Sequence, residues 1–337
     1  MRQIDSDDEA AFNAWYEVLR FTDEERWPDH PGWDHRTVKA MADLRNGATD
    51  FLCLAATGAT GTTVGIGMLQ VPQRDNRHLV MFDVRVLPNH RRRHIGAAIA
   101  AEAERWAAGA GRRVIQCEAE VPVAAATRDA SAPFARRLGY AAVQKANRRH
   151  LPLPIGGRKL RRLQAEVAAA TTGYRVHTFT APWPEAYLED CCELQRRMST
   201  DAPSGDAHHQ EEVWNPARVK EADALAAAQG LVRVIAVAED IDSGRLAAFS
   251  AIAVPEGQRS EGWQWATLVL AEHRGHRLGL AVKLANVEAL GATFPSVRLI
   301  TTANAQENAP MIAVNEMMGF EVAAVQTLWE KNMGGQW

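Results

Sequence analysis

The sequence predicts a mixed α/β protein in which one domain is present twice. A β-like run, a basic turn and a helical stretch at residues 86–97 return at residues 269–280, a constant 183 positions later. At 337 residues the chain is too long for one ordinary hydrophobic core and suits two domains of about 150 residues each. Both halves also show the same order of predicted elements: helix, helix, three strands, helix, strand, helix and strand.

In the first half, the opening helix is indicated by an N-cap at Asp7 or Asp8 and by apolar residues at helical spacing, namely Phe12, Trp15, Tyr16 and Leu19. A loop rich in Pro, Gly and Trp follows over 27–33. The remaining predicted elements are a helix over 35–46, strands over 51–55, 64–71 and 79–86, a helix over 95–108, a strand over 114–120 and a short helix over 133–138. That last helix ends at Gly139.

The second half repeats this order. Its predicted elements are a strand over 174–178, a helix over 184–198, a polar loop over 199–214, a helix over 216–229, strands over 232–238, 246–254 and 263–270, a helix over 279–293, a strand over 297–302 and a helix over 308–318. Trp329 to Lys331 are expected on the last strand. Residues 151–157 have turn chemistry, and an amphipathic helix follows over 158–170. We therefore expect an N-terminal domain over 1–155, a linker helix over 156–172 and a C-terminal domain over 173–337.

The composition is that of a globular protein, with 47% hydrophobic and 23% charged residues. A net charge of -3 argues against a general nucleic-acid binder. The stretch from Met1 to Asp8 is acidic where a signal peptide is basic, and no run of about 18 apolar residues is present. The four cysteines form neither a C-x-x-C pair nor a zinc-like spacing. These features predict a cytoplasmic protein with reduced thiols and no membrane contact.

The repeated turn has the chemistry of an anion site. Backbone N–H groups at the start of a helix lack intrahelical acceptors, and the helix dipole is positive there. The turn also supplies basic side chains, which are Arg91, Arg92, Arg93 and His94 in the first copy and Arg274, His276 and Arg277 in the second. Two such turns predict a ligand that carries phosphates.

These patterns resemble the GNAT N-acetyltransferase superfamily, and the resemblance covers both halves. Its most specific stretches are His273-Arg274-Gly275-His276-Arg277-Leu278-Gly279 and Asn304-x-x-x-Asn308-x-x-Met311-x-x-Val314-Asn315-x-x-Met318-Gly319-Phe320, which look like a tandem GNAT protein of actinobacterial type. The resemblance implies two consecutive GNAT-like acyl-CoA N-acyltransferase domains, each with a mixed sheet, and acetyl-CoA as the co-substrate.

In that family the coenzyme A pyrophosphate lies on the basic turn, and the pantetheine arm passes between two parallel strands that splay apart. The resemblance implies coenzyme A contacts from Val269, Arg274, Gly275, His276, Arg277, Leu278, Gly279, Asn304, Asn308 and Asn315. In the first half the corresponding residues are Val86, Arg91, Arg92, Arg93, His94, Ile95 and Gly96. It further implies that Asn308 bonds the arm and that a backbone N–H near Val269 polarises the thioester carbonyl.

Two departures distinguish the halves from the family and from each other. The family's first turn glycine, which permits close phosphate approach or an unusual φ, is His94 in the first half and Arg277 in the second. The family's asparagine eleven residues before the terminal glycine is Asn308 in the second half, whereas the same count from Gly139 gives Arg128. We therefore expect the preferred acetyl-CoA site in the second half, and either a second site or a degenerate copy in the first.

Acetyl transfer needs a neutral amine, so a base must remove a proton from a group whose pKa is ordinarily about 10.4. The candidate bases are Asp83, Glu118 and Glu120, all on predicted strands of the first half. Many family members place a tyrosine four residues before the terminal glycine to protonate the leaving thiolate. Those positions hold Ala135 and Asn315, and neither side chain is an acid.

The polar loop over 199–212 matches the segment that walls the acceptor pocket in the family. Its four acids and two histidines favour a cationic amine, although a solvated loop has the same composition. Asp201 and Asp206 of this loop, with Trp265 on a strand, are the predicted substrate contacts. His208 and His209 have no third ligand at a suitable spacing, so no metal is expected.

Three functions stay open at this point. The first is an acetyl-CoA-dependent N-acetyltransferase that acts on the amine of a small molecule by direct attack on the thioester. The second, motivated by the missing tyrosine and the altered glycines, is a non-catalytic acyl-CoA-binding or scaffold protein of the same fold. The third is a coenzyme A ester hydrolase or decarboxylase, which needs only an activated water. A monomer and a homodimer are both compatible with the sequence.

Overall fold

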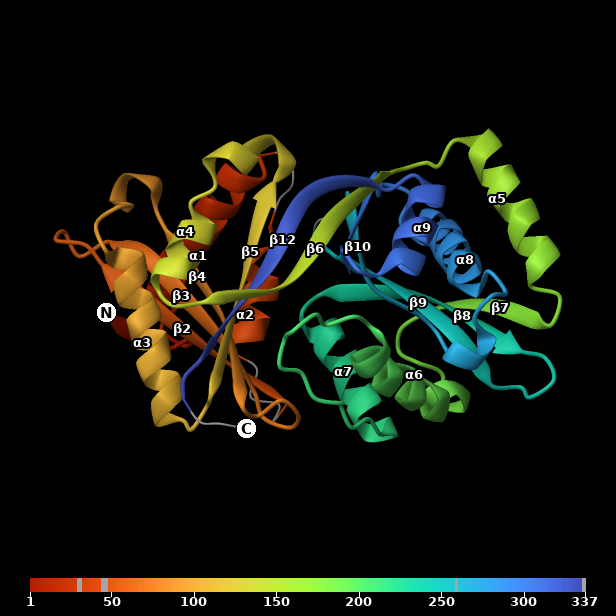
Figure 1. Ribbon diagram of the computed structural model, residues 1–337, viewed down its shortest axis with the longest axis horizontal. Helices are drawn as coiled ribbons and strands as arrows, with labels where there is room; N and C mark the ends of the chain where they lie inside the picture. Colours follow the sequence, from red (N-terminus) through yellow and green to blue (C-terminus); the bar gives the residue numbers. More distant parts are fainter. Residues whose placement is uncertain (29–31, 44–47, 258–259, 335–337) are drawn as a thin grey trace. The chain divides into compact units, whose positions relative to one another are not determined.

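The computed structural model describes residues 1–28, 32–43, 48–257 and 260–334, and its fold is mixed α/β as expected (Figure 1). The chain divides into two compact units. The first unit contains Met1–Lys145, Asp206–His209 and Gln326–Trp337, and the second contains Ala146–Gly205 and Gln210–Val325. Each unit therefore includes chain from both halves of the sequence.

The first unit has six strands in the order β1-β2-β3-β4-β5-β12. They are β1 (Arg2–Ile4), β2 (Thr49–Thr57), β3 (Thr63–Pro72), β4 (Leu79–Val86), β5 (Val114–Pro122) and the later part of β12 (Glu321–Asn332). The helices are α1 (Glu9–Arg26), α2 (His35–Asp43), α3 (Ile95–Gly109) and α4 (Ser131–Arg137), with 3-10 turns η1 (Pro88–His90) and η2 (Val123–Arg128). The helix predicted over 35–46 corresponds to α2, and the end of that range lies outside the described residues.

The second unit has the strand order β6-β11-β10-β9-β8-β7. Its strands are β6 (Ala141–Pro152, from Ala146 on), β7 (Tyr174–Thr180), β8 (Leu231–Asp240), β9 (Leu246–Pro255), β10 (Glu261–Val269) and β11 (Leu299–Ala305). The helices are α5 (Gly157–Ala170), α6 (Leu188–Asp201), α7 (Pro216–Ala228), α8 (Leu278–Thr293) and α9 (Ala309–Met318), with 3-10 turns η3 (Glu185–Tyr187) and η4 (Ala271–His273).

The last strand of each half joins the unit formed mainly by the other half. β6 pairs antiparallel with β11, from Pro152 opposite Leu299 to Ala146 opposite Ala305. The later part of β12 lies beside β5, and the Met333 N–H donates to the Arg113 carbonyl at 2.7 Å. The boundaries of the two compact units therefore differ from those of the expected domains over 1–155 and 173–337. They differ at β6, at residues 206–209 and at the end of the chain.

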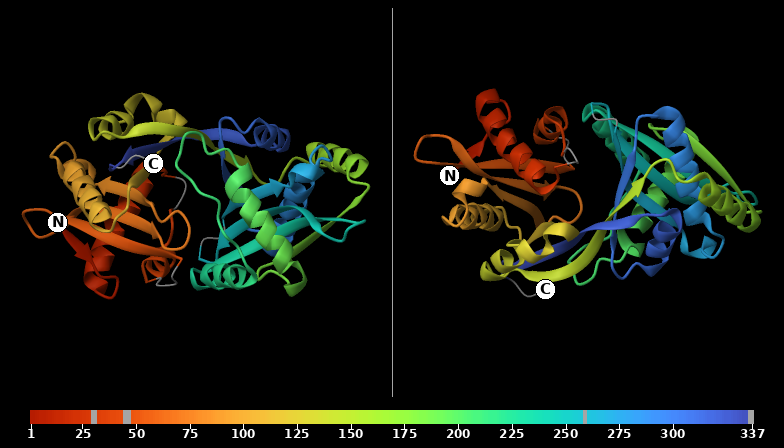
Figure 2. Two further views of the ribbon diagram at one scale, coloured as in Figure 1. Left: turned by 60° about the horizontal axis from the view of Figure 1, so that its bottom comes forward. Right: turned by 90° about the horizontal axis from the view of Figure 1, so that it is seen from above.

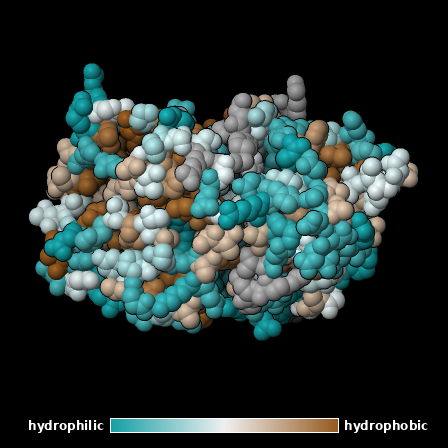
Figure 3. All heavy atoms as spheres, turned by 180° about the vertical axis from the view of Figure 1, so that it is seen from behind, coloured by the Kyte–Doolittle hydropathy of each residue, from teal (hydrophilic) through white to brown (hydrophobic). Residues whose placement is uncertain are grey.

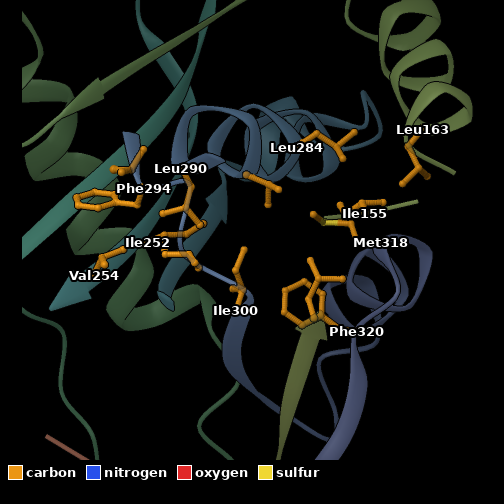
Figure 4. Close-up of a cluster of buried hydrophobic side chains, with 14 of the residues drawn as sticks. Ile155, Leu163, Ile252, Val254, Leu284, Leu290, Phe294, Ile300, Met318 and Phe320 are labelled. Carbon is orange, nitrogen blue, oxygen red and sulfur yellow. The ribbon is translucent and has the colours of Figure 1, made fainter. Parts of the chain in front are cut away.

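Two further segments differ from the sequence analysis. Leu151 and Pro152, predicted as turn, are the last residues of β6. The helix expected as a linker is α5, and its Leu163 is fully buried in the core of the second unit. Figure 4 shows Leu163 pointing into the same cluster as Ile155 and Met318. The helix between the halves therefore stabilises the second unit through its apolar stripe.

Within the first unit, helices cover both faces of the sheet. α1 and α2 pack on one face, which we call the α1 face, and α3 packs on the opposite, α3 face (Figure 2). Trp15 anchors α1, since its buried indole N–H donates to the Leu54 carbonyl at 3.0 Å. Side chains of a strand alternate between the two faces, so the register fixes which residues face which helix.

The second unit repeats these layers. α6 and α7 cover what we call its α6 face, and α8 covers the α8 face. α8 is enclosed on several sides, with ten residues buried, including Leu280, Leu284 and Leu290. These residues form one apolar cluster with Ile300 of β11 and Phe320 (Figure 4).

Polar and apolar residues both occur on the face of the protein drawn in Figure 3. Hydrophilic residues cover much of the face shown in Figure 3, with hydrophobic residues scattered among them. Across the described residues, no helix combines the length and the apolar character that crossing a membrane requires.

Candidate functional site

The two central parallel strands of each unit separate in the same way. In the first unit β4 and β5 are paired at Leu79–Val114, Val80–Ile115 and Met81–Gln116. In the second unit β10 and β11 are paired at Glu261–Leu299, Gly262–Ile300 and Trp263–Thr301. The registers of these described strands contain three pairs each, so each unit has a fork that opens toward the carboxyl ends of the strands.

At the open end of each fork, the basic turn has the same backbone in both copies. Arg92 and His94 have φ values of 60° and 62°, and the residues 183 positions later, Gly275 and Arg277, have φ values of 88° and 54°. Left-handed residues at alternate positions of a turn can aim backbone N–H groups toward one point, which favours an anion. The two copies share this geometry although three of the four positive-φ residues carry side chains.

The helices that follow these turns begin without a side-chain cap. His94 is the N-cap of α3 and Arg277 the N-cap of α8, and neither side chain makes a capping hydrogen bond. The first N–H groups of both helices therefore do not donate to a capping side chain of the N-cap residue. They lie at the positive end of the helix dipole, where they can donate to a ligand. Such a site fits a pyrophosphate.

Arg91 and Arg274 hold the turns in place. Their Nε atoms donate to the carbonyls of Val86 and Val269 at 3.0 and 3.2 Å. The Arg91 guanidinium also pairs with Glu25 of α1, and that of Arg274 lies 2.8 Å from Asp201 of α6. In this structure both arginines connect the turn to the first helix of their copy.

The other predicted turn residues have varied surroundings. Arg93 is exposed, with its guanidinium 3.4 Å from the His90 Nδ1, and the His276 ring lies 5.4 Å from that of Tyr174. The Arg277 guanidinium lies 3.2 Å from the Met317 sulfur. Four apolar positions support the helix starts: Ile95 and Gly96 in α3, and Leu278 and Gly279 in α8.

A charged network lies on the α1 face beside the fork of the first unit. Arg85 donates to Asp83 and to Asp23 of α1, both at 2.8 Å. Burial alone lowers the pKa of Arg85, but the two carboxylates raise it above its ordinary value. Burial raises the pKa of Asp23 and lowers the pKa of Arg26, which lies in the same network.

Glu120 extends this network along β5. Its carboxylate accepts from the Trp27 indole at 2.7 Å and from the Gln326 amide of β12 at 2.8 Å. Glu118 is exposed. Its side chain lies on the same face as that of Glu120, because residues two apart on a strand point the same way and Ala119 between them packs on the α3 face. The structure thus places Asp83, Glu118 and Glu120 on one face beside the fork, and we call these three residues with Asp23 the acidic cluster.

The second unit has no such cluster at the matching positions. Aligning the paired residues of the two forks places Ala303 and Ala305 where the first unit has Glu118 and Glu120. Aligning Val86 with Val269 places Ala266 and Leu268 where the first unit has Asp83 and Arg85. At these four matching positions, charged side chains are therefore present in the first unit alone.

The α6 face of the second unit carries a different group. Glu261 is buried, accepts from the Thr301 hydroxyl, and lies 3.7 Å from the buried Arg148 guanidinium. That guanidinium is 4.9 Å from the centre of the Trp263 ring. Trp265 lies at a β-bulge of β10 and is 45% exposed, so the bulge turns this predicted substrate contact outward.

The opposite, α8 face of the second unit contains a buried polar layer. The Gln264 amide donates to the Ser250 hydroxyl at 2.7 Å, and Lys283 and Asn286 of α8 are almost completely buried. Burial lowers the pKa of Lys283 to about 7. In the first unit the matching residues are Phe82, Gly67, Ala100 and Ala103, so these four positions are apolar in the first copy.

The three predicted asparagines lie near this layer. Asn304 of β11 accepts from the Asn315 amide of α9, and Asn315 is fully buried. Asn308 is the N-cap of α9, where its side-chain oxygen accepts from the Met311 N–H at 3.3 Å. The cap leaves the Asn308 amide NH₂ as the group that a pantetheine arm would meet.

The polar loop divides between the two units. Asp201 ends α6 and pairs with Arg197 and Arg274. Asp206, by contrast, belongs to the first unit, where its N–H donates to the Val143 carbonyl at 3.0 Å. His208 follows in that unit and hydrogen-bonds Glu330 of β12.

Cysteine and metal chemistry have little support at these sites. Burial raises the pKa of the Cys117 thiol far above its ordinary value, which disfavours the thiolate. Among the residues that the structure describes, no group of three or more His, Cys, Asp or Glu side chains has the arrangement of a metal site.

Sequence reasoning missed Asp23, Arg26, Arg85 and the pairing of His208 with Glu330. Arg85 and Asp83 are two apart on one strand, which was a detectable signal for a pair on one face. The sequence gives no corresponding signal for Glu330, because its partners are 122 and 214 positions away.

Comparison with known families supports the first half most directly. The family model described as "Acetyltransferase (GNAT) family" matches residues 12–140. The search of curated proteins finds no significant match. The predicted resemblance to GNAT acetyltransferases is thereby confirmed for the domain that contains β4, β5 and the first basic turn.

Solved structures extend the similarity in fold to the whole chain. A tandem GNAT protein from the clavulanic acid biosynthesis pathway aligns with a TM-score of 0.79 and 23% identity over 99% of this chain and 98% of that protein. A GCN5-related N-acetyltransferase from Sphaerobacter thermophilus aligns with a TM-score of 0.65 and 14% identity over 97% and 94% of the two chains. A glucosamine N-acetyltransferase region of a fungal multi-domain β-N-acetylglucosaminidase aligns with a TM-score of 0.68 and 14% identity over 98% of this chain and 38% of that one. The tandem GNAT fold is therefore confirmed.

Proposed function

The chain carries an acetyltransferase domain of the GNAT family and is an acyltransferase, and from this premise we propose that its first unit transfers an acetyl group from acetyl-CoA to the amine of a small cationic molecule. One observation carries the proposal. The fork of the first unit has the acidic cluster beside it, whereas the matching residues of the second unit are Ala266, Ala303 and Ala305. The proposal thus assigns transfer to the first unit, whereas the sequence analysis expects the preferred acetyl-CoA site in the second half.

The basic turn and the fork together suit acetyl-CoA. The turn at Arg92 to His94 offers N–H donors to a pyrophosphate at the open end of the fork. From Val86 to Met81 the strand extends for five residues, about 17 Å at the usual rise of a strand. An extended pantetheine arm laid along that opening would carry its thioester toward Met81 and Gln116, the last pair of the fork.

The acidic cluster suits a cationic acceptor. Four carboxylates share the α1 face with the guanidinium groups of Arg26 and Arg85, so the side chains leave an excess of negative charge. Asp83 accepts a hydrogen bond from Arg85, and Glu120 accepts hydrogen bonds from Trp27 and Gln326, so both carboxylates are fixed in position on the α1 face. These residues therefore favour the binding of an ammonium group over the removal of its proton.

In the reaction, the neutral amine nitrogen attacks the thioester carbonyl carbon. The C–N bond forms, the C–S bond breaks, and coenzyme A leaves as a thiolate that takes up one proton of the former amine, while the other proton stays on the amide nitrogen. The first unit would contribute by placing the amine between the acidic cluster and the end of the fork, which raises the effective concentration of the two reactants.

The acceptor arm of the proposal is tested by screening small amines for release of free thiol from acetyl-CoA. Amino sugars, polyamines and amino-acid-like amines form the panel. Glu118→Gln/Glu120→Gln is expected to raise the KM of a cationic substrate at least about tenfold, which corresponds to one charge-assisted contact of roughly 1.5 kcal/mol. Glu307→Gln, an exposed carboxylate of the second unit, is the control and should leave KM unchanged. Equal kinetics of the two variants would refute the role of the acidic cluster.

The site of acetyl-CoA binding is tested by calorimetry on a matched pair of turn variants. Arg93→Glu and His276→Glu place a carboxylate at equivalent exposed positions of the two turns. Loss of binding and of activity with Arg93→Glu supports transfer in the first unit. Loss of activity with His276→Glu alone returns the transfer site to the second unit. Thiol release without an amine acceptor would favour a thioester hydrolase instead.

A further inference from the structure

A histidine from the second half of the sequence lies beside the fork of the first unit. His208 is part of the segment Asp206–His209, which belongs to the first unit. Its Nδ1 hydrogen-bonds one carboxylate oxygen of Glu330, and its backbone N–H donates to the other at 3.1 Å. Two contacts to one carboxylate fix both the main chain and the ring of His208.

Glu330 connects this histidine to the closed end of the fork. The Glu330 side chain is 5% exposed, and its Oε2 accepts from the Gln116 amide at 2.9 Å. Gln116 is opposite Met81 in the last paired position before β4 and β5 separate. Gln116, Glu118 and Glu120 are every second residue of β5, so their side chains lie on the α1 face. Since Glu330 contacts Gln116 and His208 contacts Glu330, the histidine lies on the same face as the acidic cluster.

The hydrogen bond determines which ring nitrogen can act as a base. A carboxylate only accepts hydrogen bonds, so Nδ1 must carry the proton of a neutral ring, and Nε2 then carries the lone pair. Burial would raise the pKa of Glu330, but hydrogen bonds from Gln116 and His208 lower it, so Glu330 remains an acceptor. This is the arrangement of a general base that is oriented by a buried acid.

We propose that His208, oriented by Glu330, is the base that deprotonates the acceptor amine in the first unit. The inference rests on the function proposed above, and it identifies the base that the acidic cluster does not supply. Nε2 takes one proton from the substrate ammonium, and the amine nitrogen then bonds the acetyl carbon. As the C–S bond breaks, a second proton of the nitrogen passes to the coenzyme A thiolate, and the imidazolium returns its proton to solvent.

The assignment gives the second half a direct part in the chemistry of the first. His208 belongs to the loop after α6, and Glu330 belongs to the last strand of the chain. Both residues reach the first unit because their segments leave the second one. The first half alone would contain the acidic cluster without this base.

The test uses the full chain and an amine substrate from the panel above. His208→Ala is expected to lower kcat at least about 100-fold, the usual lower range for loss of a general base, while calorimetry shows unchanged acetyl-CoA binding. Added imidazole should restore part of the lost rate, because it replaces the missing ring. His209→Ala is the matched control, one residue along the same loop, and should keep the wild-type rate and show no response to imidazole.

Glu330→Gln tests the positioning role separately. It should lower kcat while the KM for the amine changes less than twofold. A His208→Ala variant with kcat within twofold of wild type would overturn the proposal. So would a loss of activity that imidazole does not restore and that the loss of acetyl-CoA binding accompanies, since that result means a structural role. A wild-type protein that acetylates none of the amines would instead contradict the proposed function itself.

Discussion

His94 and Arg277 hold backbone conformations that side chains normally avoid. Their φ values of 62° and 54° lie in the left-handed region, which costs a residue with a Cβ roughly 1–2 kcal/mol. The same conformation recurs 183 positions apart with two different side chains, so the turn and not the residue type determines it. Strain that is kept in this way is typical of a functional site.

Replacing either residue by glycine should therefore stabilise the protein. We expect His94→Gly to raise the free energy of unfolding by about 0.5–1 kcal/mol, measured by urea denaturation. Ala101→Gly, at an exposed position of the same helix, should lower it by about 1 kcal/mol. If both variants are destabilised alike, His94 is not strained.

The same residues show how far sequence reasoning reaches. It identified positions 94 and 277 as the places where the family has glycine, and the left-handed φ explains that preference. It could not predict that the backbone would stay left-handed, because the energy that holds φ comes from the whole turn. Arg91 and Arg274 were predicted as phosphate contacts, and that role stays a prediction because their guanidinium groups here pair with Glu25 and Asp201.

At the scale of single elements, α8 carries an unusual buried charge. Lys283 is 1% exposed, its Nζ lies 5.0 Å from the centre of the Phe320 ring, and burial lowers its pKa to about 7. In the unfolded chain a lysine has a pKa near 10.4. Between these two values the unfolded state binds a proton that the folded state does not, so stability must rise with pH.

This gives a prediction with a definite sign. The stability of the wild type relative to Lys283→Met should increase between about pH 7 and pH 10, by roughly 4 kcal/mol if the full difference of about three pKa units is realised. Lys220→Met, on the exposed face of α7, is the control and should show little pH dependence. If the difference in the free energy of unfolding between wild type and Lys283→Met does not change with pH, Lys283 stays protonated in the folded state.

Two substitutions of Asn308, the N-cap of α9, distinguish its structural role from a role in binding. Asn308→Ala removes the N-cap and should cost about 1 kcal/mol, whereas Asn308→Asp keeps an oxygen for the Met311 N–H and should be nearly neutral. If the amide NH₂ also binds a pantetheine arm, Asn308→Asp should weaken acetyl-CoA binding to the second unit without loss of stability. Urea denaturation and calorimetry on the two variants measure these effects.

Most elements were predictable because their hydrophobic periods are local. The central helices and the strands that flank them lie within a few residues of the expected ranges. The edge strand β1 and the full length of β6 were missed, since three residues give little periodicity and the end of β6 was interpreted as a turn. Periodicity shows that a strand is half-buried, but not which neighbour it pairs with.

At the scale of the whole molecule, the two copies distribute polar residues in opposite ways. The first unit has charges on its α1 face and an apolar α3 face, where Ala100 and Ala103 pack. The second unit has alanines at the positions that match Asp83, Glu118 and Glu120, and it has Lys283 and Asn286 buried under its α8 face. After duplication, the copies have thus diverged on opposite sides of the same fork, which fits a division of roles between them.

The exchange of last strands makes the two units depend on each other for folding. The first unit takes β12 from the second half of the sequence, and the second unit takes most of β6 from the first. A fragment of residues 1–155 would leave the edge of β5 uncovered and Gln116 without Glu330. We therefore expect this fragment to aggregate or to unfold without a cooperative transition in urea.

Joining residues 321–334 to that fragment through a flexible Gly/Ser linker should restore cooperative unfolding, because the missing strand is then supplied in the same chain. Co-expression of 1–155 with 156–337 should also rescue solubility. A fragment of residues 1–155 that unfolds cooperatively without either addition would show that β12 is dispensable for the first unit. In that case the first unit could fold without β12, and the orientation of His208 by Glu330 would depend on the separate association of β12 with it. If the fragment instead needs β12 to fold, Glu330 is present whenever the first unit is folded.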